Sequence, residues 1–321
     1  MTSNRLGLGS LMLMLISTLW FSDANSAVWV SSAPFAQGDQ CRWSLSVDQF
    51  WGYPNTERIG LQRACGMSIV ISGEITGDDA SKFTKLLNWS NELYRRGKGG
   101  VPNVVLNSEG GSVFAAINIA KAIRASANMR RGAGNTMIPA GAICYSACVI
   151  VLAGSYRRFV LGKVGIHRPF FVGNEYEQMG YKNLQQGYDR LYSELKTLFK
   201  RWNLSRSLVD DMFAVASTDV HILNDQELDS YGLGKDDWVL TEQQNAEVRA
   251  ACGGQDLAES AANPTFWGSA TGEECLREMN AREREIFRDK VKKLCDASDA
   301  NTFNRGQRPS QGCLDKVYAT E

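Results

Sequence analysis

A serine lies among small residues where a glycine-containing loop gives way to an apolar segment. The stretch Pro139–Gly154 has the sequence Pro-Ala-Gly-Ala-Ile-Cys-Tyr-Ser-Ala-Cys-Val-Ile-Val-Leu-Ala-Gly, and Ser146 stands near its centre. A hydroxyl at the amino end of a helix lies where free N–H groups and the helix dipole favour developing negative charge. Ser146 is therefore a candidate nucleophile, although a serine that merely caps the helix has the same sequence pattern.

Any mechanism that needs an imidazole must use one of two histidines, because His167 and His221 are the only ones in the 321-residue chain. His167 ends the apolar segment Val-Gly-Ile-His, shortly after the serine, and a histidine that titrates near neutrality suits a general base. A single histidine in a strand is also compatible with an ordinary packed residue. His221 matches no motif, and we expect it to be structural or exposed.

A glycine pair follows an apolar strand pattern in Asn-Ser-Glu-Gly-Gly-Ser, residues 107–112. Glycines allow a sharp turn between strand and helix and leave backbone N–H groups unobstructed, as an oxyanion site requires. The pair by itself is also typical of a plain turn.

The order of these motifs resembles the ClpP peptidase family of the wider ClpP/crotonase superfamily. A strand with Gly-Glu-Ile-Thr, the Ser-x-Gly-Gly turn, the loop with the serine and a strand ending in Ile-His-x-Pro follow one another within Met67–Leu233. The resemblance implies an α/β fold with a ClpP/crotonase-like stacked ββα-type core, and a homo-oligomer. It implies Ser146 as nucleophile, His167 as general base, and the amides of Gly111 and Ala147 as the oxyanion hole.

The resemblance also implies an aspartate that holds the histidine, placed before a Tyr-Gly-Leu that occupies 231–233 here. Asp219 is the nearest candidate, although strict alignment puts Val220 at that position and a one-residue insertion is needed to recover Asp219. Asp225 and Asp229 are weaker alternatives, and Asp219 also fits the simple start of a strand.

Residues beside the motifs depart from the family pattern. Glu109 replaces the usual proline before the glycine pair, which places a carboxylate beside the oxyanion site unless the side chain points to solvent. Cys144 and Cys148 flank the serine, and their spacing suits either a local disulfide or two small buried thiols.

Strand and helix patterns alternate along the middle of the chain, which predicts a mostly parallel sheet with helices packed on it. Apolar alternation predicts strands at 67–72, 103–107, 136–138, 159–161, 164–167 and 219–223. Helical spacing predicts helices at 78–96, 112–125, 146–153, 181–203, 204–216 and 225–233, the last closed by Gly232.

Composition indicates a globular chain, with 44% hydrophobic and 22% charged residues. The 35 basic and 35 acidic side chains give no net charge, so nothing favours nucleic acid or anionic lipid as a partner. Arg5, the apolar run 6–21 and the small residues up to Ala27 predict a secretory signal cleaved after Ser26. We therefore expect a periplasmic or secreted protein, with a membrane tether through an uncleaved signal as the weaker alternative.

Eight cysteines in an exported chain favour disulfides, and no C-x-x-C spacing indicates a zinc site, so we expect no metal or cofactor. Cys275 and Cys295 lie about 30 Å apart along one expected helix and cannot pair with each other. We expect Cys41 to pair with Cys65, and the four C-terminal cysteines to pair across the ends of that helix.

The chain divides into a signal peptide at 1–26, a ClpP/crotonase-like domain at 27–245 and a cysteine-containing tail at 246–321. An amphipathic pattern near 273–294 predicts that the tail is a small disulfide-braced helical unit.

The leading functional hypothesis is an exported serine hydrolase that cleaves peptide bonds through a Ser-His-(Asp) acyl-enzyme mechanism. The alternatives are an inactive relative that binds a peptide or protein, or a Ser–Lys peptidase with Lys163 as base. The lysine is weaker because His167 already occupies the base position. Acyl-CoA chemistry is weaker still, since CoA is not expected outside the cytoplasm.

Overall fold

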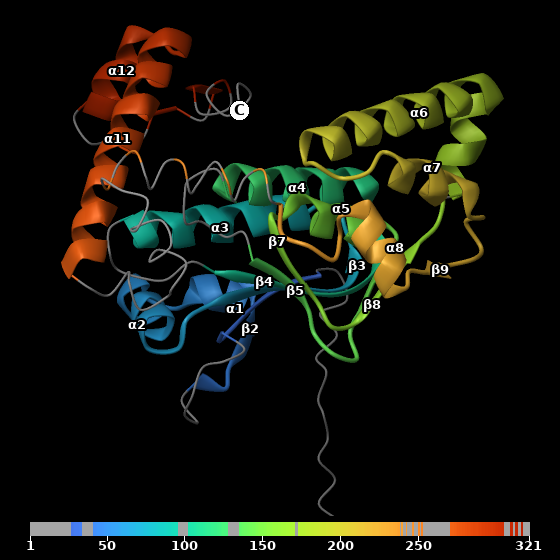
Figure 1. Cartoon of the computed structure of the whole chain (residues 1–321), viewed down its shortest axis with the longest axis horizontal. Coiled ribbons are helices and arrows are strands. Elements are labelled where there is room, and N and C mark those ends of the chain that lie inside the picture. Colours follow the sequence, from blue (N-terminus) through green and yellow to red (C-terminus); the bar gives the residue numbers. More distant parts are fainter. Residues whose placement is uncertain are drawn as a thin grey trace, which may run out of the picture.

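The structure of the protein is a computed structural model (Figure 1). It describes residues 27–33, 41–95, 102–127, 135–170, 173–237 and 270–304, with isolated positions between 239 and 252 and between 309 and 316. For 173–182 and part of 270–284 only the backbone is described. The expected signal peptide at 1–26 and the expected domain boundary at 245 lie outside the described residues.

The strands form one branched sheet whose centre is parallel, as the alternation of strands and helices predicts. β3 pairs with β4, which pairs with β5 through its first half and with β6 through its second half. β5 continues to β7, and β6 continues to β8. The bounds are Ser68–Ile75 for β3, Asn103–Gly111 for β4, Asn135–Ile138 for β5, Ile143–Tyr145 for β6, Arg157–Val160 for β7 and Lys163–Ile166 for β8.

Antiparallel strands complete the two edges of this sheet. β1 (Val28–Ser31) lies between β3 and β2 (Ser44–Ser46), and the helices α1 (Val47–Gly52) and α2 (Asn55–Cys65) follow. The expected Cys41–Cys65 disulfide is confirmed and ties the loop before β2 to the end of α2, with 5.2 Å between the Cα atoms. At the other edge β9 (His221–Ile222) pairs with β8.

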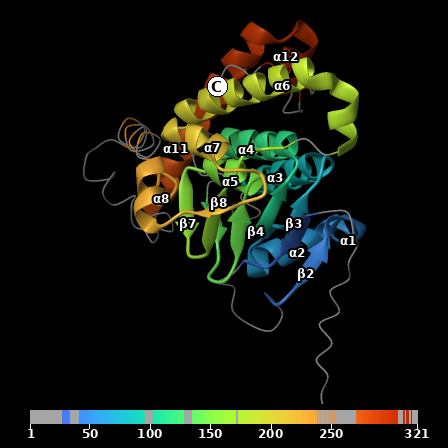
Figure 2. The ribbon, with the colours of Figure 1, turned by 90° about the vertical axis from the view of Figure 1, so that its right-hand side faces the viewer.

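Three helices cover one face of the sheet (Figures 1 and 2). They are α3 (Asp79–Arg95), α4 (Val113–Ala127) and α5 (Ala147–Gly154), and every residue of α5 is buried. Small residues let α4 and α5 approach closely, since a Cβ added at Gly154 would lie 2.5 Å from the Ala120 carbonyl oxygen. α5 is therefore a fixed part of the core rather than a surface helix.

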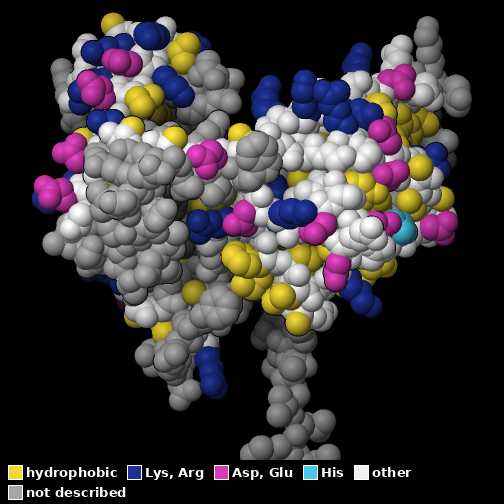
Figure 3. Space-filling model, in the orientation of Figure 1, with side chains coloured by type: hydrophobic (Ala, Val, Ile, Leu, Met, Phe, Trp, Pro, Cys, Tyr) yellow, Lys and Arg dark blue, Asp and Glu magenta, His cyan; other side chains and the backbone are white. Residues whose placement is uncertain are grey.

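The long helix α6 (Gly173–Arg201) lies over this helix layer, and Lys121 of α4 donates a hydrogen bond to Glu194 of α6 at 3.0 Å (Figure 2). α7 (Ser207–Ala214) and α8 (Asp225–Tyr231) follow, and α8 ends at Gly232 in the left-handed conformation, as expected. Acidic and basic side chains are interspersed over the face in Figure 3, in keeping with the neutral net charge.

The C-terminal region forms the helical, disulfide-braced unit that the sequence predicts. α11 (Ala270–Leu294) and α12 (Ala297–Asn304) pack around buried Val291, and the bridges are Cys252–Cys275 and Cys295–Cys313. Together with the other bridges they are typical of an oxidising environment. Each helix in the described ranges is too short or too polar to span a bilayer.

A buried ion pair joins the helix layer to the chain after α8. Arg124 of α4 donates a hydrogen bond to Asp237, which also accepts one from Asn203 at 2.9 Å. Nearby Arg158 donates to the carbonyl oxygens of Gly232 and Lys235, both at 2.9 Å. Burial, with the neighbouring charge of Arg124, lowers the pKa of Arg158 to about 10.

Asp237→Ala is expected to lower the free energy of unfolding by about 3–5 kcal/mol, because it leaves Arg124 buried without its charged partner. Denaturant unfolding followed by circular dichroism measures the effect. The matched control is Asp236→Ala, whose exposed pairing with Arg157 contributes at most about 1 kcal/mol. Equal losses in the two variants would contradict this role for the buried pair.

Candidate active site

Ser146 occupies a sharp turn between β6 and α5. Its backbone has φ 55° and ψ −124°, a conformation that non-glycine residues rarely adopt and that costs about 1–3 kcal/mol. It stands at the N-cap position of α5, but its half-buried hydroxyl makes no capping hydrogen bond. The structure therefore does not use the hydroxyl as an ordinary helix cap. A strained strand-to-helix turn is also where several acyl-transfer enzymes hold their serine.

The glycine pair at the end of β4 lies directly behind this serine. A Cβ added at Gly110 would lie 2.7 Å from the Ser146 Cβ and 3.1 Å from the Ala147 amide nitrogen. The sequence pattern predicted a turn at the glycine pair. The structure corrects this prediction, because β4 continues through Gly111, which pairs with Ile75 of β3. The strand continues because glycine accepts the φ of 113° found at Gly110 and allows the close approach.

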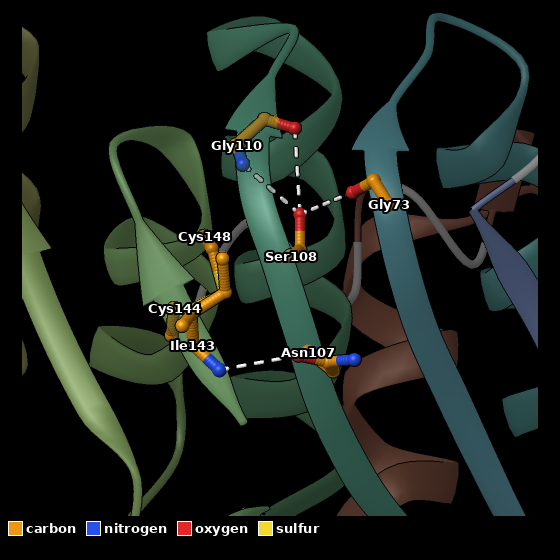
Figure 4. Close-up of a disulfide and its surroundings, with 7 residues drawn as sticks. All are labelled: Gly73, Asn107, Ser108, Gly110, Ile143, Cys144 and Cys148. Carbon is orange, nitrogen blue, oxygen red and sulfur yellow. Dashed lines mark hydrogen bonds between the residues drawn. A yellow bond between two sulfur atoms is a disulfide. The ribbon is translucent and has the colours of Figure 1, made fainter. Parts of the chain in front are cut away.

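Two polar residues of β4 fix this arrangement (Figure 4). The Ser108 hydroxyl donates to the Gly73 carbonyl at 2.5 Å and accepts from the Gly110 amide at 3.1 Å. The Asn107 side-chain oxygen accepts from the amide of Ile143 at 3.1 Å, which holds the start of β6 against β4. Neither residue was predicted to have a role, although polar side chains at the end of an apolar strand are a recognisable signal in the sequence.

A disulfide joins Cys144 and Cys148 across the serine, so the local bridge, and not the pair of thiols, is present (Figure 4). Both cysteines are completely buried. A bridge of sequence separation 4 contributes only about 2 kcal/mol through the entropy of the unfolded chain. The Cys41–Cys65 bridge, with separation 24, contributes about 3.5 kcal/mol by the same reasoning.

His167 follows β8, two residues beyond Gly165, whose carbonyl accepts a hydrogen bond from the Ser146 amide at 2.9 Å. The ring is buried, and exposed Phe170 stacks on it with 6.1 Å between centroids. Its Nδ1 lies 2.9 Å from the Arg168 carbonyl oxygen. A carbonyl oxygen only accepts, so Nδ1 carries a proton, and Nε2 is the basic nitrogen of the neutral ring.

The side chains of the predicted triad are not hydrogen-bonded to one another. Among the described residues, no hydrogen bond joins Ser146 to His167 or His167 to Asp219. Asp219 is exposed on the loop before β9, and neighbouring Val220 packs over Gly165, where a Cβ would lie 2.6 Å from its Cγ1. The role of Asp219 stays a prediction.

The remaining candidate acids and bases lie on the surface. Asp225 and Asp229 are exposed on α8, and Asp229 lies 3.5 Å from Lys235. Lys163 is exposed at the end of β8 away from the serine. His221 is exposed, as expected, and its Nε2 lies 2.8 Å from the Glu227 carboxylate. The Asn224 amide and His221 hold the pKa of Glu227 below its usual value.

Of the two predicted oxyanion residues, Ala147 directly follows Ser146 in the chain and Gly111 is the last residue of β4. Ala147 is the first residue of α5, so its N–H has no partner within the helix. Gly111 directly follows Gly110, which packs against the serine. Glu109 is exposed, which agrees with the expectation that its carboxylate can point to solvent instead of toward the oxyanion site. The structure thus places a hydroxyl at a strained turn, an imidazole just beyond the neighbouring strand β8 and an amide at the start of α5, and serine acyl transfer uses groups of these kinds.

Comparison with known proteins gives distant structural likenesses. No family model and no curated protein matches the sequence. A ClpP1 mutant from Listeria monocytogenes is 17% identical, with TM-score 0.41 over 56% of this chain and 91% of its own. ClpP1 from the same organism is 18% identical, with TM-score 0.38 over 51% and 86%.

Gly110→Ala is expected to displace Ser146, because the new methyl group has no room beside the serine and the φ of 113° disfavours alanine. A displacement of about 1 Å lowers the rate of a positioned reaction about 100-fold, so we expect that loss in labelling by a fluorophosphonate probe. Gly77→Ala is the control, since a Cβ there meets no atom within 4 Å. Unchanged labelling in Gly110→Ala would contradict this geometry.

Proposed function

We propose that the protein is an exported serine hydrolase that cleaves peptide bonds through an acyl-enzyme. The observation that carries the proposal is the strained conformation of Ser146, with φ 55°, pressed against Gly110 and bonded through its amide to Gly165. Such strain persists only where the surroundings enforce it, and it concentrates at functional sites.

In this mechanism Nε2 of His167 takes the proton from the Ser146 hydroxyl as its oxygen attacks the substrate carbonyl. The amides of Gly111 and Ala147 stabilise the negative oxygen of the tetrahedral intermediate. The intermediate collapses when His167 returns the proton to the leaving amine. Water, deprotonated by the same imidazole, then attacks the acyl-enzyme, and Ser146 leaves with the proton.

The Arg168 carbonyl performs part of the work of a triad acid. Its contact with Nδ1, at 2.9 Å, selects the tautomer in which Nε2 is free to accept a proton. A neutral carbonyl stabilises an imidazolium less than a carboxylate does, and Asp219 is the candidate for that further role if the loop before β9 brings it to the ring. No hydrogen bond joins Asp219 to the ring in the described structure, so the mechanism that we propose uses Ser146 and His167 as a dyad.

Apolar side chains around the site support a polypeptide substrate. Phe114 follows the glycine pair, Phe170 covers His167, and Val220 and Ile222 pack against Gly165. All four are exposed, by 64%, 57%, 43% and 41%. Exposed apolar groups rimming a polar centre are typical of a surface that binds a partner.

The proposal includes the remaining features that the sequence suggests. The core domain covers 27–245 and the helical tail 246–321, and the mature protein is periplasmic or secreted and self-associates into a homo-oligomer. The disulfides support export, because such bridges persist in oxidising compartments. A membrane tether through the uncleaved segment 1–26 is the alternative form.

An inactive protein that binds a peptide or protein partner is the second candidate function. The observation that favours it is the missing hydrogen bond between Ser146 and His167 in the described structure. Catalytic hydrogen bonds often tighten only when substrate is bound, so the same observation is compatible with an enzyme.

A fluorophosphonate probe is expected to label the wild-type protein at Ser146, and Ser146→Ala and His167→Ala are expected to abolish that labelling. The serine supplies the nucleophile and the histidine its base, so loss of either stops phosphonylation. Peptide mapping by mass spectrometry identifies the site. His221→Ala is the matched control and should label normally. Labelling that survives Ser146→Ala contradicts the proposal, and a wild type that takes no label favours the binding function.

Asp219→Asn is expected to slow labelling by less than about tenfold, against the roughly 10⁴-fold loss that follows replacement of a working triad acid. The reason is that Asp219 is exposed and the Arg168 carbonyl already occupies Nδ1. Asp225→Asn is the control. A loss close to the larger value would place Asp219 on the ring in the reacting state and replace the dyad by a triad.

A further inference from the structure

We propose that the Cys144–Cys148 disulfide positions Ser146 for reaction by holding the turn between β6 and α5 in the conformation that presents the hydroxyl. The inference rests on the proposed function, because it assigns a role at the same candidate nucleophile. The two cysteines are positioning residues that act through the serine.

Both ends of the turn are anchored in the core. Cys144 lies in β6, paired with Ser108 of β4 on one side and Val164 of β8 on the other. Cys148 lies in the first turn of α5 and is completely buried. The bridge holds their Cα atoms 5.2 Å apart, so Tyr145, Ser146 and Ala147 must complete the turn within a closed covalent ring.

The serine has a competing conformation that the bridge opposes. A serine at an N-cap usually has negative φ, and its hydroxyl accepts from the second or third amide of the helix, here Cys148 or Val149. Ser146 has instead a positive φ and no capping bond. Relaxation to an ordinary cap would remove the strain and would also occupy the hydroxyl.

Three contacts keep Ser146 in the strained state. Two are non-covalent, namely the hydrogen bond from its amide to Gly165 and the close approach of Gly110. The third is the disulfide, the one covalent restraint that spans the residue itself. Strained conformations persist only where several restraints agree, so loss of the bridge should release the serine.

Global stability does not explain a bridge at this place. The ring is short, so it restricts the unfolded chain less than the Cys41–Cys65 bridge does. The helix that it joins is also completely buried by its own apolar residues. The bridge therefore acts locally, on the backbone conformation of Ser146, which it encloses.

The test compares Cys144→Ala/Cys148→Ala with Cys41→Ala/Cys65→Ala, which removes the remote bridge. We expect two measurements to rank the variants in opposite order. The melting temperature falls more for the remote pair because its bridge closes the longer loop. Labelling of Ser146 by the fluorophosphonate falls about 100-fold only in the variant without the local bridge, as a displaced nucleophile requires.

The kinetic form of the loss separates positioning from general damage. The rate constant of phosphonylation at saturating probe should fall in Cys144→Ala/Cys148→Ala, while the probe concentration for half-saturation stays unchanged. If that variant does not fold, Cys144→Val/Cys148→Ala restores part of the lost volume and takes its place in the same measurements.

Labelling as fast as that of the wild type in the variant without the local bridge overturns the inference and leaves the proposed function standing. An equal loss of labelling in the variant without the remote bridge also overturns it, since the effect is then one of stability. A wild-type protein that takes no label overturns the proposed function, and the positioning role of the bridge with it.

Discussion

The contact between Gly110 and Ser146 is the constraint on which the rest of the site depends. A side chain at Gly110 would meet the serine Cβ at 2.7 Å, so β4 and the turn before α5 fit together only because this residue is glycine. Ser108 and Asn107 hold the end of β4 and the start of β6 in register with each other. Buried α5 and strand β8 then fix the turn from the other side, through Cys148 and the Gly165 carbonyl. The strain at Ser146 is thus imposed by the branched sheet as a whole.

The regular part of the fold could be predicted because long apolar patterns dominate there. The helix expected at 78–96 is α3 at Asp79–Arg95, and the strand expected at 103–107 is the first half of β4. The N-terminal elements β1, β2 and α1 were not predicted, since they have four, three and six residues, too short for a period to show. The strand β6 was not predicted for the same reason, since it has only three residues. The eleven-residue helix α2 was not predicted either. The end of β4 was predicted as a turn because two glycines usually interrupt a strand, whereas here pairing with Ile75 and the packing of the serine override that tendency.

The sequence singles out the candidate site as residue types in order, but it does not give their contacts. Ser146 and His167 stand out because each follows an apolar segment and histidine is scarce in this chain. Backbone groups carry no sequence signal, so the Arg168 carbonyl that binds Nδ1 could not be foreseen. The bridge across the serine was one of two alternatives, because spacing alone allows either a disulfide or two thiols. The choice of acid partner depended on a one-residue shift of the alignment between Asp219 and Val220. In the structure, the apolar side chain of Val220 lies beside Gly165 of β8.

The most direct test of the central claim is a crystal structure of the protein after reaction with a fluorophosphonate. We expect phosphorus bonded to the Ser146 hydroxyl oxygen, with the phosphoryl oxygen about 2.7–3.1 Å from the amides of Gly111 and Ala147. We also expect Nε2 of His167 within hydrogen-bonding distance of the serine oxygen, while Nδ1 keeps its contact with the Arg168 carbonyl. Phosphorus on another residue, or a phosphoryl oxygen turned away from both amides, would contradict the proposed mechanism.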